Sequence, residues 1–278
     1  MKRGSDYAKR IKRLYHELLR KHGKPAPIDP VEPIEQMIIG ILALDSSISR
    51  AHAVYKKLRQ QTVDLNDLRV TPALELAQMI GDGVPLAGSK AQRIVNALNA
   101  VRRRQDTLDL EFLRQRGRRE ARDYLESLDG IGLTVAAHVV LFSLGGHAIP
   151  VDNLTLYVLR KEGLVDKNAD IAAVQGFLER WIGASEAGDF TYLMTRHASA
   201  YASRVPLEKL AELLYPPPPK PQPPKPQLVV KPPPAARPPE VKGKPAKDKV
   251  ETKAVAKAKP PETQPAKAQS AVRVQKKK

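Results

Sequence analysis

The chain contains no cysteine among its 278 residues. This absence excludes disulfides, thiolate zinc sites and cysteine-bound iron–sulfur clusters, and it fits a reducing compartment. No apolar run is long enough to cross a bilayer, and residues 1–23 are too charged to contain the apolar core of a signal peptide. The six histidines show neither HExxH nor paired spacing, and no carboxylate cluster accompanies them, so no metal site is predicted. We therefore expect a soluble intracellular protein.

Positive charge is concentrated at the C-terminal end of the chain. Residues 216–278 contain 17 prolines and 16 lysines or arginines but only four acids, so they hold +12 of the total charge of +17. With no aromatic residue and no periodic apolar pattern, this segment cannot offset the entropy lost on folding, and we predict a disordered tail. Such a tail attracts polyanions, nucleic acid above all. The alternative is a spacer without a ligand, and a membrane surface is disfavoured because the tail has no apolar anchor.

The remaining 215 residues read as an all-α protein of about ten helices, with weak strand signals throughout. Residues 5–22 form an amphipathic basic helix that ends at Gly23, and a proline-rich connector follows over residues 24–33. Ser89 is a start signal for a helix over residues 90–104. Further helices are predicted over residues 34–44, 51–60, 73–80, 119–128, 135–144, 153–161, 171–182, 190–204 and 207–214.

A tight turn with two glycines joins the helix over residues 119–128 to one that begins near Thr134. Only glycine adopts positive φ at low cost, and the absence of side chains at Gly130 and Gly132 leaves backbone amides bare. Together with the dipole of the second helix, these amides would bind an anion such as a DNA phosphate. The alternative is an ordinary corner that uses glycine as a helix C-cap.

This turn is the centre of a longer pattern. The run Leu-x-Gly-Ile-Gly-x-x-x-Ala-x-x-Val begins at Leu128, and Ile-Pro-Val-Asp follows and ends at Asp152. The pattern resembles the helix-hairpin-helix (HhH-GPD) glycosylases of the endonuclease III superfamily, over roughly residues 28–205. The run Gly-Ser-Lys-Ala-Gln-Arg-Ile, which ends at Ile94, is similar to a family segment that opens a helix facing DNA.

The resemblance implies an architecture. A glycosylase-like domain over residues 28–215 would have two helical lobes, with the hairpin motif at the mouth of the cleft between them. Lobe one would span about 34–146, and lobe two about 150–215 together with the N-terminal basic helix of residues 1–27. Double-stranded DNA would be the partner of a monomeric protein, located in the cytoplasm with the nucleoid or elsewhere inside the cell.

The same resemblance assigns the site residues. Asp152 matches the family's catalytic aspartate, which stabilises the cationic sugar and orients the nucleophile, although an aspartate here is also a good helix N-cap, and both roles are compatible. Residues Gly130, Ile131, Gly132 and Thr134 would grip one DNA strand, and Ser89 and Lys90 would contact a phosphate.

The chain also departs from the family pattern. Thr134 stands where bifunctional members carry a Schiff-base lysine, so we expect a water-using, monofunctional enzyme without lyase activity. The family's four-cysteine loop is missing, which leaves no expected cofactor. Asp45 stands where relatives often carry a glutamine that fills the gap left by a flipped nucleotide, and a carboxylate there would repel phosphates or need a partner.

Two functions follow from these observations. The first is a base-excision repair glycosylase that hydrolyses the N-glycosidic bond of a damaged or mismatched base, with Asp152 as the catalytic residue. The second is a non-catalytic DNA-binding or architectural protein that kept the scaffold but lost the lysine. An open pocket beside Asp152 favours the enzyme, and a filled one favours the binder.

Overall fold

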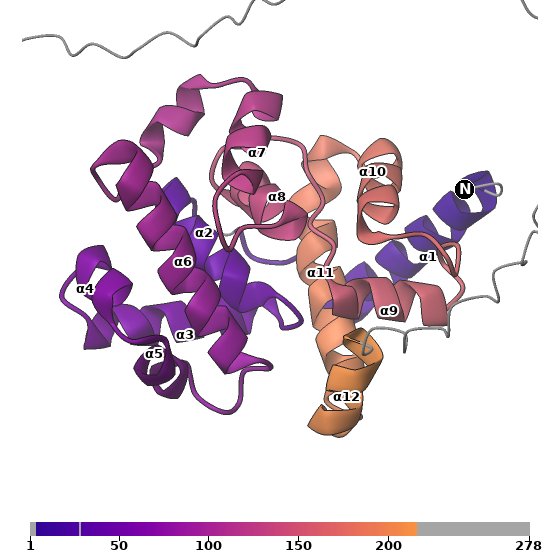
Figure 1. The fold of residues 1–278 in the computed structure, drawn as a ribbon. Coiled ribbons are helices and arrows are strands. Elements are labelled where there is room, and N and C mark those ends of the chain that lie inside the picture. Colours follow the sequence, from indigo (N-terminus) through magenta and orange to yellow (C-terminus); the bar gives the residue numbers. More distant parts are fainter. Residues whose placement is uncertain (1–3, 28, 216–278) are drawn as a thin grey trace, which may run out of the picture. The chain divides into compact units, whose positions relative to one another are not determined.

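The computed structural model describes residues 4–27 and 29–215, and all the regular secondary structure within these residues is helical (Figure 1). The predicted tail, residues 216–278, lies outside the described residues. The all-α prediction is confirmed, and no helix in the described part is long and apolar enough to cross a membrane. The α-helices are α1 (Gly4–His22), α2 (Pro33–Ala43), α3 (Ile48–Gln61), α4 (Leu65–Val70), α5 (Ala73–Ile80), α6 (Ala87–Gln105), α7 (Arg118–Glu126), α8 (Leu133–Phe142), α9 (Asn153–Lys161), α10 (Ile171–Trp181), α11 (Ala184–Ala202) and α12 (Leu207–Leu214), with a 3-10 turn η1 (Glu111–Gln115) before α7.

The first hydrophobic core is built from α2 to α8 and centres on α2. Ten of the 11 residues of α2 are buried, as its apolar character on all sides requires. Gly40 lets α8 come close, because a Cβ at this position would lie 3.1 Å from the Cβ of His138 and 3.2 Å from Cγ1 of Val135. Helix α8, which follows the two-glycine turn, is thereby fixed against the middle of this core.

The second core lies among α1, α9, α10 and α11. Helix α1 contributes Ile11, Tyr15 and Leu18 at helical spacing, as its sequence pattern predicts, while its lysines and arginines stay outside. Figure 1 shows α1 beside α10 and α11, although these segments are distant in the sequence. The N-terminal helix therefore completes a core otherwise built from residues after 148.

A third, small cluster fixes α12. Leu210 and Leu214 pack on Leu154 and Val158 of α9 and on Ala198 of α11. This packing carries Tyr215, the residue after α12, to the turn between α2 and α3.

Helix starts differ most from the sequence predictions. Helix α6 begins at Ala87 after Leu86, which has left-handed backbone (φ 56°), so Ser89 lies within the helix instead of capping it. Helix α3 begins at Ile48 instead of residue 51, because Ser47 caps it: the Ser47 Oγ accepts from the Arg50 amide at 3.3 Å. The short α4 and η1 were not predicted, because five or six residues display too little periodicity.

Candidate active site and DNA-binding hairpin

The two-glycine turn packs tightly against α6. Gly130 has φ 85°, and a Cβ there would lie 2.6 Å from the carbonyl oxygen of Arg93. Glycine is thus required both for the backbone conformation and for space. The side chain of Ile131 is buried in the first core, and its amide donates to the carbonyl of Leu128 at 3.1 Å, so neither is directed to a ligand.

The N-terminus of α8 is the open side of this turn. Gly132 is the N-cap residue, and no described side chain caps the helix, so its first amides are not satisfied in this way. Arg93 donates from Nε to the carbonyl of Gly130 at 2.9 Å, and its Nη2 would lie 3.6 Å from a Cβ at Gly132. The dipole of α8 and the guanidinium of Arg93 therefore both place positive charge at the start of α8, where an anion would bind.

Thr134 connects the hairpin to the segment that carries Asp152. Its Oγ1 donates to the carbonyl of Val151 at 2.6 Å. The residue at the family's lysine position therefore has a structural partner one position before the candidate catalytic acid, and it holds the start of α8 against the start of α9.

Asp152 is the N-cap of α9 and is buried, with 7% of its surface exposed. Its Oδ1 accepts from the Thr155 amide and its Oδ2 accepts from the Asp45 amide, both at 2.7 Å. Burial, followed by the nearby carboxylate of Asp45, raises the pKa of Asp152 to about 6. The N-cap alternative is therefore realised in the structure, and the same carboxyl group is perturbed in the way that active-site acids often are.

Asp152 lines a cavity of about 640 Å³, which lies within the range of small-ligand sites. The start of α8 forms one wall of the cavity, and the starts of α9 and α10 form others. Arg93, Arg160 and Asn153 bring polar groups to the lining, whereas Leu44, Leu156 and Ile171 bring apolar ones. The start of α8 and the candidate acid thus share one open pocket, which is the arrangement that favours an enzyme over a binder.

Lys90 does not lie at the surface where a phosphate contact was predicted. Only 3% of its surface is exposed, and Nζ donates to the carbonyl of Leu42 at 3.0 Å. Burial lowers the pKa of Lys90 to about 8, although Asp45 and Asp152 act in the opposite direction. Helix α6 begins three residues earlier than predicted, so Lys90 lies within its first turn, on the same face as the buried Ile94 and Ala97, while Ser89 is exposed. Of the two, Ser89 alone is accessible to a ligand in this structure.

Three residues of the site were not predicted as site residues. Arg93 follows Lys90 on the same helix, Asp45 precedes α3, and Tyr215 follows α12, and all three line the cavity. The hydroxyl of Tyr215 donates to Oδ2 of Asp45. For these three residues the sequence offered one signal. Asp45 stands in place of the family's glutamine, and a carboxylate at that position needs a partner.

The comparisons with known proteins cover only parts of this chain. No family model matches it. DEMETER-like protein 2 of Arabidopsis thaliana is 36% identical over 91 residues, which are 33% of this chain and 7% of that protein. An A. thaliana protein named as a DNA glycosylase is 30% identical over 112 residues, 40% of this chain and 38% of that protein. The chain therefore spans well under half the length of either curated relative.

Solved structures match over a larger share. An endonuclease III trapped as a covalent intermediate with DNA aligns with a TM-score of 0.52 and 23% identity, over 68% of this chain and 84% of that one. The chain has the endonuclease III fold. An 8-oxoguanine glycosylase/lyase of Clostridium acetobutylicum, bound to double-stranded DNA, aligns with a TM-score of 0.53 and 15% identity, over 72% and 71% of the two chains. These alignments confirm, at the level of the fold, the resemblance predicted from the two-glycine turn.

Proposed function

We propose that this protein is a DNA glycosylase that flips a damaged or mismatched base out of the duplex and hydrolyses its bond to deoxyribose. The observation that carries the proposal is the position of Asp152: a buried carboxyl group on the wall of an open cavity, beside the uncapped start of α8. The endonuclease III fold and a curated relative named as a DNA glycosylase support the same reaction class.

Asp152 would act on the sugar. Departure of the base leaves positive charge on the deoxyribose, and an ionised carboxylate beside it stabilises that charge and orients an attacking water. Because the pKa of Asp152 is raised to about 6, the carboxylate is ionised at neutral pH yet close enough to that pH to accept a proton from water. The reaction should therefore slow as the pH falls through 6.

The start of α8 and Arg93 would hold a phosphate of the strand that carries the flipped nucleotide.

Leu86 would assist as a wedge between stacked base pairs. It is an apolar residue that is 40% exposed, with left-handed backbone, at the end of the loop that leads into α6. Apolar side chains of this kind separate stacked base pairs in many proteins that bend DNA.

We further propose that catalysis is monofunctional. A lyase step needs an amine in reach of the sugar. Thr134 occupies the family's lysine position, and Lys90 is buried against Leu42 and does not line the cavity. Lys161 is exposed on α9 and donates to the hydroxyl of Tyr201 instead. No lysine of the described residues lines the cavity with Asp152, which favours water as the nucleophile.

The test is single-turnover base release from duplexes that contain uracil, oxidised or alkylated bases, with alkali added to reveal abasic sites. Asp152→Asn keeps the shape of the N-cap and should lower the rate by at least about 100-fold. Asp64→Asn is the matched control, because Asp64 is also an N-cap, of α4, but does not line this cavity. Equal rates for wild type and Asp152→Asn would contradict the assignment of Asp152.

Borohydride trapping tests the monofunctional mechanism separately. We expect no protein–DNA adduct and no strand cleavage before alkali is added. Any adduct would contradict this expectation, and its loss in Lys90→Met would identify Lys90 as the amine. If no duplex in the screen loses a base while binding to undamaged DNA remains steeply salt-dependent, the non-catalytic DNA-binding protein becomes the better assignment.

A further inference from the structure

A second buried acid, Asp45, lies beside Asp152 and has no role in the proposed reaction. Only 2% of its surface is exposed. Its Oδ1 accepts from the amide of Leu154 at 2.9 Å, and its Oδ2 accepts from the hydroxyl of Tyr215. The Asp45 carboxylate is therefore directed into the protein, where Leu154 and Tyr215 donate to it, and not towards a gap in DNA. Burying a carboxylate costs free energy, which the bonds from Leu154 and Tyr215 offset in part.

Each acid accepts a hydrogen bond from a backbone amide in the segment that carries the other acid. Asp45 donates its amide to Oδ2 of Asp152 at 2.7 Å, while the Asp45 side chain binds the amide of Leu154, two residues after Asp152. Asp45 belongs to the turn after α2, in the first core, whereas Asp152 and Leu154 begin α9, which packs in the other two. This reciprocal pair is thus a clasp between the two halves of the site.

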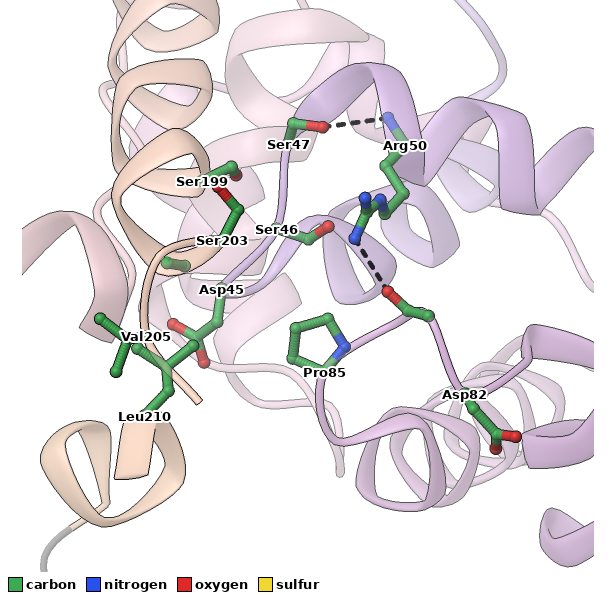
Figure 2. Close-up of a pocket in the computed structure, with 12 residues that line it drawn as sticks. Asp45, Ser46, Ser47, Arg50, Asp82, Pro85, Ser199, Ser203, Val205 and Leu210 are labelled. Atoms are coloured by element: carbon green, nitrogen blue, oxygen red, sulfur yellow. Dashed lines mark hydrogen bonds between the residues drawn. The ribbon is translucent and has the colours of Figure 1, made fainter. Parts of the chain in front are cut away.

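The backbone of Asp45 is adapted to this contact. Its φ of 53° is left-handed, a conformation that costs energy for any residue with a Cβ, although aspartate tolerates it better than most. Such strain is retained where the surrounding structure requires it, and it is frequent at functional sites. Asp45 also lines a second cavity of about 230 Å³, and Figure 2 labels it with Val205 and Leu210 among the lining residues.

Several charged groups face the pair from the elements packed around it. Lys90 lies close enough for its charge to act on both acids, and Tyr215 contacts Asp45 from the end of α12. Arg93, Arg160 and Asp170 share the cavity lining with the pair. Burial is the larger cause of the raised pKa of Asp152, and the negative charge of Asp45 is the next. Asp45 therefore affects both the position and the ionisation of Asp152.

We propose that Asp45 is a positioning residue for Asp152: its amide fixes the orientation of the Asp152 carboxyl group, and its carboxylate places a second negative charge beside that group. This inference rests on the proposed function for its meaning in catalysis, but the physical coupling of the two acids can be measured without any reaction. The hydroxyl of Tyr215 supports the arrangement by binding the outer oxygen of Asp45.

Two substitutions separate the two contributions. Asp45→Asn keeps the shape: its carbonyl oxygen can accept from Leu154, and its amide can donate to the Tyr215 oxygen. It removes the charge, so the acid limb of the single-turnover pH profile should move to lower pH with a similar plateau. Asp45→Ala removes the side-chain contacts and should lower the plateau roughly 100-fold, the loss typical of a misplaced catalytic group. Asp64→Asn, which removes a capping acid elsewhere, should leave both the limb and the plateau unchanged.

The titration of Asp152, followed by carboxyl carbon NMR in the full-length protein, gives a readout independent of activity. In Asp45→Asn its midpoint should fall below that of wild type, with denaturation curves verifying that the variant is folded. An unchanged midpoint in a folded Asp45→Asn protein would overturn the proposal. A lowered midpoint in a protein that releases no base would instead uphold the coupling while contradicting the glycosylase assignment.

Discussion

Replacing Gly130 with alanine tests whether the hairpin is fixed by α6. At φ 85°, alanine has left-handed strain of about 1–2 kcal/mol. Its Cβ would also lie 2.6 Å from the carbonyl oxygen of Arg93 and 3.4 Å from the amide nitrogen of Ala97, so the turn must shift away from the helix. Overpacking of this kind costs about 1–3 kcal/mol. Gly130→Ala should therefore lower the free energy of unfolding by about 2–5 kcal/mol.

Gly132→Ala is the matched control from the same turn. Gly132 has φ −114°, which any residue adopts, and its Cβ would lie 3.6 Å from Nη2 of Arg93, an ordinary contact. This variant should lose no more than about 1 kcal/mol, the usual cost of alanine at an N-cap, yet bind DNA more weakly because the methyl group partly covers the amides of α8. Urea denaturation with a DNA titration measures both quantities. Equal stability losses in the two variants would refute the reasoning about the contact with α6.

Further predictions concern the hairpin helix, its buried histidine and the basic tail. Thr134→Val removes the bond to the carbonyl of Val151, leaves that acceptor without its partner and should cost about 1–3 kcal/mol of stability by urea denaturation, with a larger fractional loss of base release. Burial lowers the pKa of His138 from 6.5 to about 3, so the unfolded chain binds a proton that the folded one does not, and stability is lost as the pH falls from 6.5 towards 3. The free energy of unfolding of His138→Leu should therefore fall less steeply with pH than that of wild type over this range. Parallel plots of this free energy against pH would contradict the lowered pKa of His138. Removing residues 222–278 should weaken DNA binding at low salt and reduce the slope of log affinity against log salt, and an unchanged slope would exclude the tail from DNA binding.

The local features of the hairpin could be predicted from the sequence. Gly130 and Gly132 mark a turn because Gly130 adopts a positive φ that favours glycine, and Asp152 follows at the distance that the family pattern requires. Helices α5, α9 and α12 have the predicted bounds, since their apolar spacing and flanking residues agree. Each of these features depends on neighbours in the sequence, which is why pattern reasoning found them.

The surroundings of Asp152 could not be predicted in the same way. Its contact with Asp45 joins residues 107 apart, and the bond from Tyr215 to Asp45 joins residues 170 apart. Lys90 was expected at the surface because its helix was expected to begin at residue 90, with Ser89 as its cap, instead of at Ala87. Lys90 instead lies four residues before Ile94 and seven before Ala97, on the face of α6 that packs into the first core, so its side chain is buried.

The clasp between Asp45 and Asp152 also limits how this protein can move. Swinging α9 away from the turn after α2 would break both hydrogen bonds between the two segments, so the amides of Asp45 and Leu154 would lose their carboxylate acceptors. Hinge opening would thus remove one of the two backbone amides that orient the Asp152 carboxyl group. For the proposed glycosylase reaction, the contacts of Asp152 are complete only in the closed protein, so the deformation that extrudes a nucleotide would fall on the DNA duplex.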